Sequence, residues 1–426
     1  LEQRSLVVTE EVAATTSMHF RMLETVREFA AEQLSATDAH GGQLLRQQHA
    51  DFFASLAEEG EKQFHGPDAV TWLDRLESDH DNFRAALEWV LANPEFIDFG
   101  LRIAAGLHRF WYIRGYLSEG RRWLQKVLNT SGTGEPTVVR ANALSAAAGL
   151  AGAEGEITAA HSLHAEALTT QRICNDVRGI SYSLCYLGLV ASGQNDHDRA
   201  HEYYQESLKI AREIRDEGNE AHVLKCLGAN AMMRGDTDLA EQLFEESLAM
   251  YRRFGDRRGI AMVLGELSGL VLYHKKDYAK AEAYLGENLK LARQINDVVH
   301  TAHALSGLGQ LAQARGDYSQ AKAYLDEGLN LFRTRGYEWE VLPLLTCFAN
   351  LSVAQQEHGR AVRIEAAADA LSRRLNPALP DSDQECEKPS LAELRSALGS
   401  AAFETAWAEG AAMSLDQVIH YTIEAS

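Results

Sequence analysis

A repeat of about 40 residues runs through the middle of this chain and constrains its fold more than any other feature. Each unit carries a small residue, an acidic residue, an alanine, a leucine and an arginine at fixed spacing, with one extra residue near Lys275 and Lys276. In that order the five columns are Ala148, Gly188, Gly228, Gly269 and Gly309; Glu156, Asp196, Asp236, Asp277 and Asp317; Ala160, Ala200, Ala240, Ala281 and Ala321; Leu168, Leu208, Leu248, Leu289 and Leu329; and Arg172, Arg212, Arg252, Arg293 and Arg333. A fixed period of this size indicates stacked supersecondary units rather than one compact core, so the functional question becomes what such a surface binds.

Each unit is predicted to be a pair of helices. No proline occurs between Pro136 and Pro343, and a proline inside a helix costs about 3 kcal/mol. Glycine or asparagine can end a first helix in the left-handed conformation, and an aspartate can cap the second helix. Two helices of about 16 residues therefore form each unit. The turns are expected at Gly155-Glu156, Asn195-Asp196, Gly235-Asp236, Lys276-Asp277 and Gly316-Asp317.

The remaining segments follow other patterns. The residues around Val7-Val8 and Met18–Met22 predict two short strands joined by a polar turn. Helical patterns with weaker periodicity follow, and they are interpreted as divergent repeats or an entry cap. After a proline-containing loop, two capping boxes open the last helices, at Ser390-x-x-Glu393 and Ser414-x-x-Gln417. The predicted segments are 1–35, 36–136 (entry cap), 137–376 (repeats) and 377–426 (loop and capping helices).

Composition limits the classes of partner. The 426 residues carry a formal net charge of −20, from 61 acidic and 41 basic residues. A phosphate backbone attracts a basic face, so we expect no direct contact with nucleic acid. The five cysteines are scattered without a C-x-x-C motif, which suits a reducing compartment. No apolar run approaches the roughly 18 residues of a membrane helix. We expect a cytoplasmic chain that does not interact with membranes.

The sequence offers few candidates for a catalytic or metal-binding motif. The pairs His161-x-x-His164 and His300-x-x-His303 have helical metal-ligand spacing, but the sequence fixes no cysteine or carboxylate beside them. They are interpreted as ordinary surface or seam histidines, so we expect no metal site. The chain contains neither G-x-S-x-G nor H-E-x-x-H. We therefore expect no catalytic residues and no enzyme.

The spacing of small, alanine and large apolar residues resembles the tetratricopeptide repeat. Gly188, Ala200 and Tyr204 follow that pattern. Gly228, Ala240 and Phe244 follow it too, whereas Leu285 and Leu325 replace the aromatic residue in later units. The period is longer than usual, which implies extended helices. The resemblance implies an all-α, right-handed superhelical solenoid of helix pairs, here preceded by a small N-terminal β-hairpin.

A narrower resemblance covers almost the whole chain. The stretches Phe20–Ala30, Trp72–Leu87 and Phe403–Leu415 are similar to segments of large bacterial STAND-type transcriptional regulators. The resemblance implies that 1–35 is the C-terminal remnant of a winged-helix domain and that the rest is a sensor arm. Because the chain begins at Leu1 within a strand-like pattern, we expect it to be a piece of a longer protein. No G-x-x-x-x-G-K-[ST] motif occurs. We therefore expect no cofactor in this chain, and expect ATP in an upstream nucleotide-binding module that would be its partner.

The tetratricopeptide pattern also implies where a ligand binds. In a right-handed stack the first helices line the concave side, and the repeat fixes which positions project there. The columns carried over are Tyr182, His222, Val263 and His303; Cys185, Lys225, Glu266 and Ser306; Leu189, Ala229, Leu270 and Gln310; and Ser192, Met232, Tyr273 and Gln313. From these, the predicted groove residues are Tyr182, His222, Lys225, Glu266, Tyr273, His303, Gln310 and Gln313. The alternative is that these side chains simply face solvent.

The sequence thus predicts a sensor that binds a peptide, a small molecule or a protein in its groove. The alternative is a constitutive protein–protein interaction scaffold that senses no ligand. An unsuspected enzyme is the third hypothesis. A ligand that stabilises the isolated arm would favour the first hypothesis, and turnover by the chain would exclude both binding hypotheses.

Overall fold

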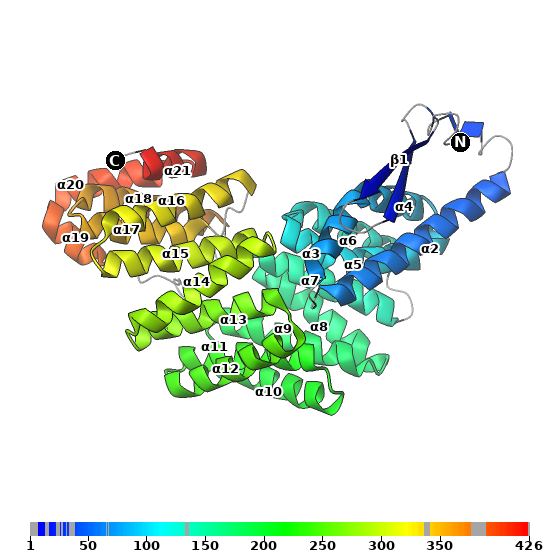
Figure 1. Ribbon diagram of the computed structural model, residues 1–426, viewed down its shortest axis with the longest axis horizontal. Helices are drawn as coiled ribbons and strands as arrows, with labels where there is room; N and C mark the ends of the chain where they lie inside the picture. The colour runs from blue at the N-terminus through cyan, green and yellow to red at the C-terminus, as the bar shows by residue number, and fades with distance from the viewer. Residues whose placement is uncertain are drawn as a thin grey trace. The chain divides into compact units, whose positions relative to one another are not determined.

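The structure is a computed structural model that describes residues 7–12, 17–22, 26, 29–30, 32–33, 39–64, 66, 68–132, 136–335, 341–375 and 389–424. Its fold is an all-α helical repeat with 20 α-helices in the described part (Figure 1). Contacts divide the chain into two compact units, 1–150 with 169–175 and 151–168 with 176–426. The predicted loop at 377–388 and the strand connection at 13–16 lie outside the described residues.

The first unit holds two short strands and a group of helices. The strands pair antiparallel, with Val7 opposite Met22. Its elements are β1 (Val7–Val12), β2 (Ser17–Met22), α2 (Ala39–Gln63), α3 (Ala69–Ser78), α4 (His80–Ala92), the 3-10 turn η2 (Pro94–Phe96), α5 (Ile97–Arg114), α6 (Leu117–Ser131) and most of α7 (Val138–Ala153). Helices α2 and α5 pack closely because Gly106 lies against the backbone of Ala57, where a Cβ would approach the Ala57 carbonyl carbon to 2.8 Å.

The second unit contains the regular helix pairs. Its elements are most of α8 (Ile157–Ile173), then α9 (Val177–Gly193), α10 (His197–Glu213), α11 (Glu217–Met233), α12 (Thr237–Phe254), α13 (Arg257–Gly269), the π-helical turn η3 (Leu270–His274), α14 (Tyr278–Gln294), α15 (Val298–Ala314), α16 (Tyr318–Arg335), α17 (Val341–Ala354) and α18 (His358–Leu375). We call α9, α11, α13, α15 and α17 the first helices, and α10, α12, α14, α16 and α18 the second helices. Each first helix packs on the second helix that follows it, and α11, α13, α15 and α17 also pack on the second helix before them.

Aspartates cap both helices in the four pairs from α9–α10 to α15–α16, and they do so by the same geometry. Asp236 caps the second helix α12 and accepts a hydrogen bond from the Leu239 backbone N–H at 3.1 Å. Asp216 caps the first helix α11 and accepts from the Asn219 N–H at 3.1 Å. The residue before the Asp236 cap, Gly235, has a left-handed φ of 84°. These contacts satisfy backbone donors that the helix leaves unpaired, and they confirm the predicted turns.

The alanine column is the seam within each pair. Ala200, Ala240, Ala281 and Ala321 are all fully buried. The small residue of the first helix lies beneath the large residue of the second, so a Cβ at Gly228 would approach the Phe244 ring to 2.7 Å. The pairing of glycine and aromatic ring therefore sets how closely the two helices approach.

The extra residue of the repeat is absorbed by the π-helical turn η3. Asp236 N bonds the carbonyl of Ala231, five residues earlier, whereas Asp277 N reaches back six residues to Val271. The insertion therefore follows Gly269, and the buried Ser268 occupies the place of Gly228. In α13 and η3, the residues that the sequence repeat assigns to each column therefore lie one position C-terminal to the true structural equivalents. Gly269 is not a seam residue, and a Cβ there would meet no described atom within 4 Å.

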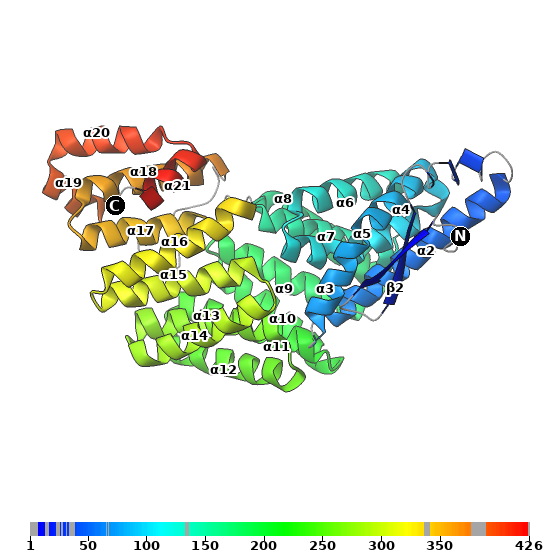
Figure 2. The same cartoon turned by 45° about the horizontal axis from the view of Figure 1, so that its top comes forward.

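The chain's last described helices close one end of the second unit (Figure 2). They are α19 (Leu391–Leu398), α20 (Ser400–Ala411) and α21 (Leu415–Glu424), and they pack on α18, with α21 also on α16. Ser390 and Ser414 cap α19 and α21 by accepting backbone N–H groups three residues on, which confirms both predicted caps. Phe403 and Leu394 fill an apolar cluster with Val362.

Candidate functional site

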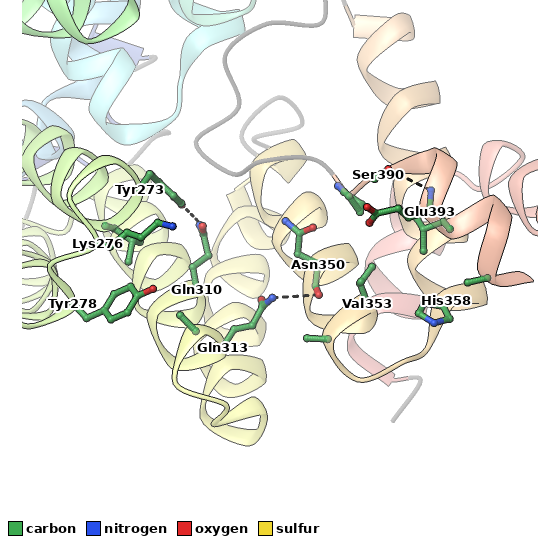
Figure 3. A pocket seen from close by; sticks show the side chains of 16 residues that line it. Tyr273, Lys276, Tyr278, Gln310, Gln313, Asn350, Val353, His358, Ser390 and Glu393 are labelled. Atoms are coloured by element: carbon green, nitrogen blue, oxygen red, sulfur yellow. Dashed lines mark hydrogen bonds between the residues drawn. The ribbon is translucent and has the colours of Figure 1, made fainter. Parts of the chain in front are cut away.

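A pocket of about 730 Å³ opens on the first helices of the second unit. Its floor comes from α15 and α17, one wall from η3 and the start of α14, and the opposite wall from the starts of α18 and α19 (Figure 3). The lining residues are Leu272, Tyr273, Lys276, Tyr278, Gln310, Gln313, Ala314, Asn350, Val353, Ala354, His358, Pro389, Ser390, Glu393, Leu394 and Ala397. The volume and the mixture of apolar and polar lining are typical of ligand sites.

Three predicted groove residues line this pocket: Tyr273, Gln310 and Gln313. The Tyr273 hydroxyl donates to the Gln310 side-chain oxygen, and Gln313 Nε2 donates to the Asn350 backbone carbonyl at 3.3 Å (Figure 3). The contacts run from one first helix to the next. They leave each carboxamide with further donor or acceptor capacity, because a glutamine side chain offers two N–H groups and two lone pairs.

Opposite charges stand on opposite walls of the pocket. Lys276 lies on the wall that also holds Tyr273 and Tyr278, whereas Glu393 lies on the opposite wall beside Ser390 (Figure 3). Lys276 has a left-handed φ of 53°, because it holds the turn position that glycine or asparagine occupies in other repeats. Glu393 is fixed by the first turn of α19, where its N–H bonds the Ser390 hydroxyl. The site therefore presents a cation and an anion to one cavity.

The sequence missed several lining residues, although one signal for them exists. Asn350 stands 40 residues after Gln310, and Val353 stands 40 after Gln313. Extending the two groove columns by one repeat would have found both. The wall residues Glu393 and His358 follow no repeat column, because they belong to the helices that close the unit.

Three other predicted groove residues gather in a second place, on α11 and α13. The His222 Nε2 and Cys226 Sγ atoms are 3.8 Å apart, and Cys226 Sγ lies 4.0 Å from Cys185 Sγ on α9. Beside them, Lys225 Nζ is 3.8 Å from the Glu266 carboxylate. Cys185 and Cys226 are fully buried. This sulfur–imidazole group was not expected from the sequence.

Charges around Cys226 favour its thiolate. The Cys185 thiol donates a hydrogen bond to Cys226 Sγ, and this lowers the pKa of Cys226 by more than burial raises it. The nearby Lys225 and His222 lower that pKa further. Together they hold the pKa of Cys226 well below the ordinary thiol range, while the shared proton raises the pKa of Cys185. Burial alone would lower the pKa of Lys225, but Cys226 and Glu266 reverse that effect and raise it. The lysine is therefore charged.

The last two predicted groove residues, Tyr182 and His303, are neither among the pocket-lining residues nor among the sulfur and imidazole groups of the second place. The Tyr182 ring is 5.8 Å from the Arg178 guanidinium. The His303 ring lies 6.4 Å from Phe332 and 6.3 Å from His300. His300 itself bonds Asp297, the cap of its own helix, at 2.8 Å.

Some column positions are interior rather than open to a groove. Cys185, Val263, Leu270 and Ser306 are buried. Val263 and Leu270 were placed in groove columns 41 residues after His222 and Ala229. The structure keeps a spacing of 40 up to Gly269, because the extra residue lies in η3. Glu266 is likewise one position beyond the equivalent of Lys225, although its side chain remains partly exposed and reaches Lys225. Tyr186, which the columns omitted, stacks on His164 with ring centroids 4.9 Å apart.

Among the described residues, no helix combines the length and apolar character needed to cross a membrane.

Comparison with protein families identifies tetratricopeptide repeats. Residues 181–217 and 259–334 match two models of that repeat. The matched residues cover most of α9, all of α10 and most of α13 to α16. These helices of the second unit are therefore a tetratricopeptide-like helical repeat.

Sequence relatives are found among bacterial regulators. Over 150 residues the chain is 31% identical to a protein of Mycobacterium bovis named "Putative HTH-type transcriptional regulator", and equally to proteins of that name from Mycobacterium tuberculosis. The match covers 34% of this chain and 16% of each relative. The chain thus spans about a sixth of the length of these relatives.

Solved structures with the same fold include two Rap proteins. One, complexed with competence and sporulation factor, covers 78% of this chain and 99% of its own, with TM-score 0.58 and 12% identity. The Rap conjugation gene regulator of plasmid pLS20 with the Phr* peptide has the same coverage, TM-score 0.54 and 10% identity. A STAND protein with a tetratricopeptide repeat sensor from Pyrococcus horikoshii covers 96% of this chain and 57% of its own, with TM-score 0.52 and 14% identity.

Proposed function

We propose that this chain is a sensor arm that binds a short peptide or a peptide-like polar ligand in the pocket on its first helices. The observation that carries the proposal is the row of carboxamides from Gln310 and Gln313 to Asn350 on the floor of a cavity of about 730 Å³. A carboxamide both donates and accepts hydrogen bonds, as a peptide group does. Such side chains can pair with a peptide backbone whatever its sequence.

The charges of the pocket favour a zwitterionic ligand. Lys276 on one wall suits a carboxylate, and Glu393 on the other suits an ammonium group. An extended peptide advances about 3.3 Å per residue, so a chain of a few residues spans such a cavity. Apolar side chains of the ligand would contact Leu272, Val353 and Leu394.

The comparisons support a binding role for this fold. The two Rap neighbours are complexed with competence and sporulation factor and with the Phr* peptide, and a third neighbour, NprR, is complexed with its cognate peptide NprX. Their identities of 10–14% convey the shared fold and no more. The pocket residues of this chain therefore carry the argument for its own ligand.

We further propose that the arm belongs to a larger cytoplasmic regulator of the STAND type. The relatives named as transcriptional regulators are about six times longer than the matched segment, and the STAND neighbour bears a tetratricopeptide sensor. In this proposal 1–35 ends a winged-helix domain, and ATP is bound upstream by a module that contacts the arm. Ligand binding in the right-handed stack would shift the arm relative to that module. The competing hypothesis remains a scaffold that binds a protein without sensing a ligand.

The test is affinity selection of linear peptides of about five to seven residues by the full chain, read by mass spectrometry. Selected peptides are then titrated against Lys276→Glu and Gln313→Ala. The matched controls are Lys209→Glu and Gln205→Ala, whose side chains are exposed on the second helix α10.

We expect the pocket variants to lose at least tenfold in affinity, a difference of about 1.4 kcal/mol, and the controls to bind as the wild type does. Equal affinity in all four variants would place the site elsewhere. If no peptide is retained but a folded protein partner is, the scaffold hypothesis replaces the proposal.

A further inference from the structure

Three metal-ligating side chains meet between adjacent first helices, away from the pocket. They are Cys185 of α9 with His222 and Cys226 of α11. The three donor atoms all lie within 4.8 Å of one another. His222 and Cys226 are four residues apart on one helix, so both face the same neighbour.

We propose that Cys185, His222 and Cys226 form a zinc site that joins two neighbouring repeats. Tetrahedral Zn²⁺, with Zn–S bonds of about 2.3 Å and a Zn–N bond of about 2.0 Å, separates two sulfur ligands by about 3.8 Å and sulfur from nitrogen by about 3.5 Å. The observed separations are 4.0 Å between the sulfurs and 3.8 Å from Cys226 Sγ to His222 Nε2. Contraction of about 0.2–0.3 Å brings these pairs to ligand distances.

The charges around the site suit a divalent ion. Two thiolates and a neutral imidazole neutralise Zn²⁺ completely. Lys225 adjoins Cys226 in the sequence, and the Glu266 carboxylate 3.8 Å from its Nζ atom compensates its charge. The buried group therefore carries no net charge when the metal is bound, which is the condition for placing ions out of water.

Access and coordination number also fit. Both sulfurs are buried, but His222 is only half-buried, so an ion enters from its side. Three protein ligands leave a fourth position, which water fills. Cysteine and histidine together favour zinc over magnesium or calcium, which take oxygen ligands. The bonds would connect α9 to α11, so the metal would stabilise the stacking of these two repeats.

The experiment is a zinc titration of the full, untagged and reduced chain against a competing chromophoric chelator. We expect one Zn²⁺ per chain and a melting temperature that rises with zinc. Cys185→Ser and Cys226→Ser should each lose binding by at least a hundredfold, and His222→Gln by at least tenfold. Cys174→Ser is the matched control, because Cys174 lies outside the group, and it should bind one ion with wild-type affinity.

A cobalt substitution separates a built site from adventitious binding. Co²⁺ bound by thiolates gives a near-ultraviolet charge-transfer band, which the wild type and Cys174→Ser should show and Cys226→Ser should lack. Melting of each variant without metal shows that it folds. The proposal is overturned if the reduced chain binds no zinc, if the two serine variants keep wild-type affinity, or if Cys185 and Cys226 form a disulfide whose reduction restores no metal binding.

Discussion

Gly188 lies directly beneath the ring of Tyr204, so closely that a Cβ at position 188 would be 2.4 Å from the ring carbon Cε1. Tyr204 is fully buried, so its ring packs inside the helix pair rather than against solvent. Gly228 and Phe244 repeat the arrangement in the next pair, at 2.7 Å. The absence of one carbon atom thus determines how closely α9 and α10 pack.

Gly188→Ala should therefore destabilise the second unit. Overpacking a rigid core costs about 1–3 kcal/mol, which exceeds the gain of about 0.5–1 kcal/mol from replacing a helical glycine. The control is Gly193→Ala in the same helix, where a Cβ meets no described atom within 4 Å. Urea unfolding measures both. Equal midpoints for the two variants would show that the Tyr204 ring gives way without cost.

The π-helical turn leads to the opposite expectation for Gly269. The sequence repeat aligns it with Gly228, but the structure places it one position beyond the seam. Gly269→Ala should leave the free energy of unfolding unchanged or raise it by about 0.5–1 kcal/mol. Gly228→Ala in the same assay should lower it. A loss at Gly269 as large as at Gly228 would contradict the register described above.

The helix pairs were predictable because their signals are local. An aspartate cap and a left-handed residue mark each turn within a few positions, as at Asn195-Asp196. The position of the extra residue was not, because Ser268 and Gly269 are both small and either fits a seam. The hydrogen bond from Asp277 N to the Val271 carbonyl and the burial of Ser268 distinguish them. Element boundaries thus follow from local chemistry, whereas register depends on packing between helices.

The candidate sites also contain one part that the sequence predicts and one part that it does not. Gln310 and Gln313, which the repeat columns predicted as groove residues, line the pocket, and Asn350 lies in the next unit of the Gln310 column. The meeting of Cys185 with Cys226 was not predicted, since the repeat aligns Cys185 with Lys225. Contacts between neighbouring first helices join positions that are not equivalent. A column shows which side chains are alike, but not which ones touch.

Acid sensitivity should arise from His164, which is buried against Tyr186. Burial, with a smaller effect of His161, lowers the pKa of His164 to about 3 from its ordinary value near 6.5. A depressed folded pKa means that stability is complete above about pH 6.5 and is lost as the pH falls towards 3, because the unfolded chain binds the proton. At pH 5 the loss is about 2 kcal/mol.

His164→Phe should remove that part of the pH dependence, since phenylalanine can also stack on Tyr186 and does not titrate. The measurement is urea unfolding at pH 7.5 and pH 5. The difference between the two values should shrink by about 2 kcal/mol relative to wild type. The control is His420→Phe, at an exposed position, which should leave the difference unchanged. An unaltered pH dependence in His164→Phe would mean that His164 is protonated in the folded chain.

Two capping aspartates should differ in how much they stabilise the fold. Asp236 is exposed and accepts the Leu239 N–H, so Asp236→Ala should cost about 1 kcal/mol. Asp297 caps α15 in the same way, but it is buried and also accepts from Arg258 Nε at 3.1 Å and His300 Nδ1 at 2.8 Å. Because removing one partner of a buried ion pair costs about 3–5 kcal/mol, Asp297→Ala should lose at least about 3 kcal/mol at pH 7. Asp297→Asn keeps a cap acceptor without the charge and should fall between these values. Losses of equal size for Asp236→Ala and Asp297→Ala in urea unfolding would show that the buried ion pair adds nothing to the cap.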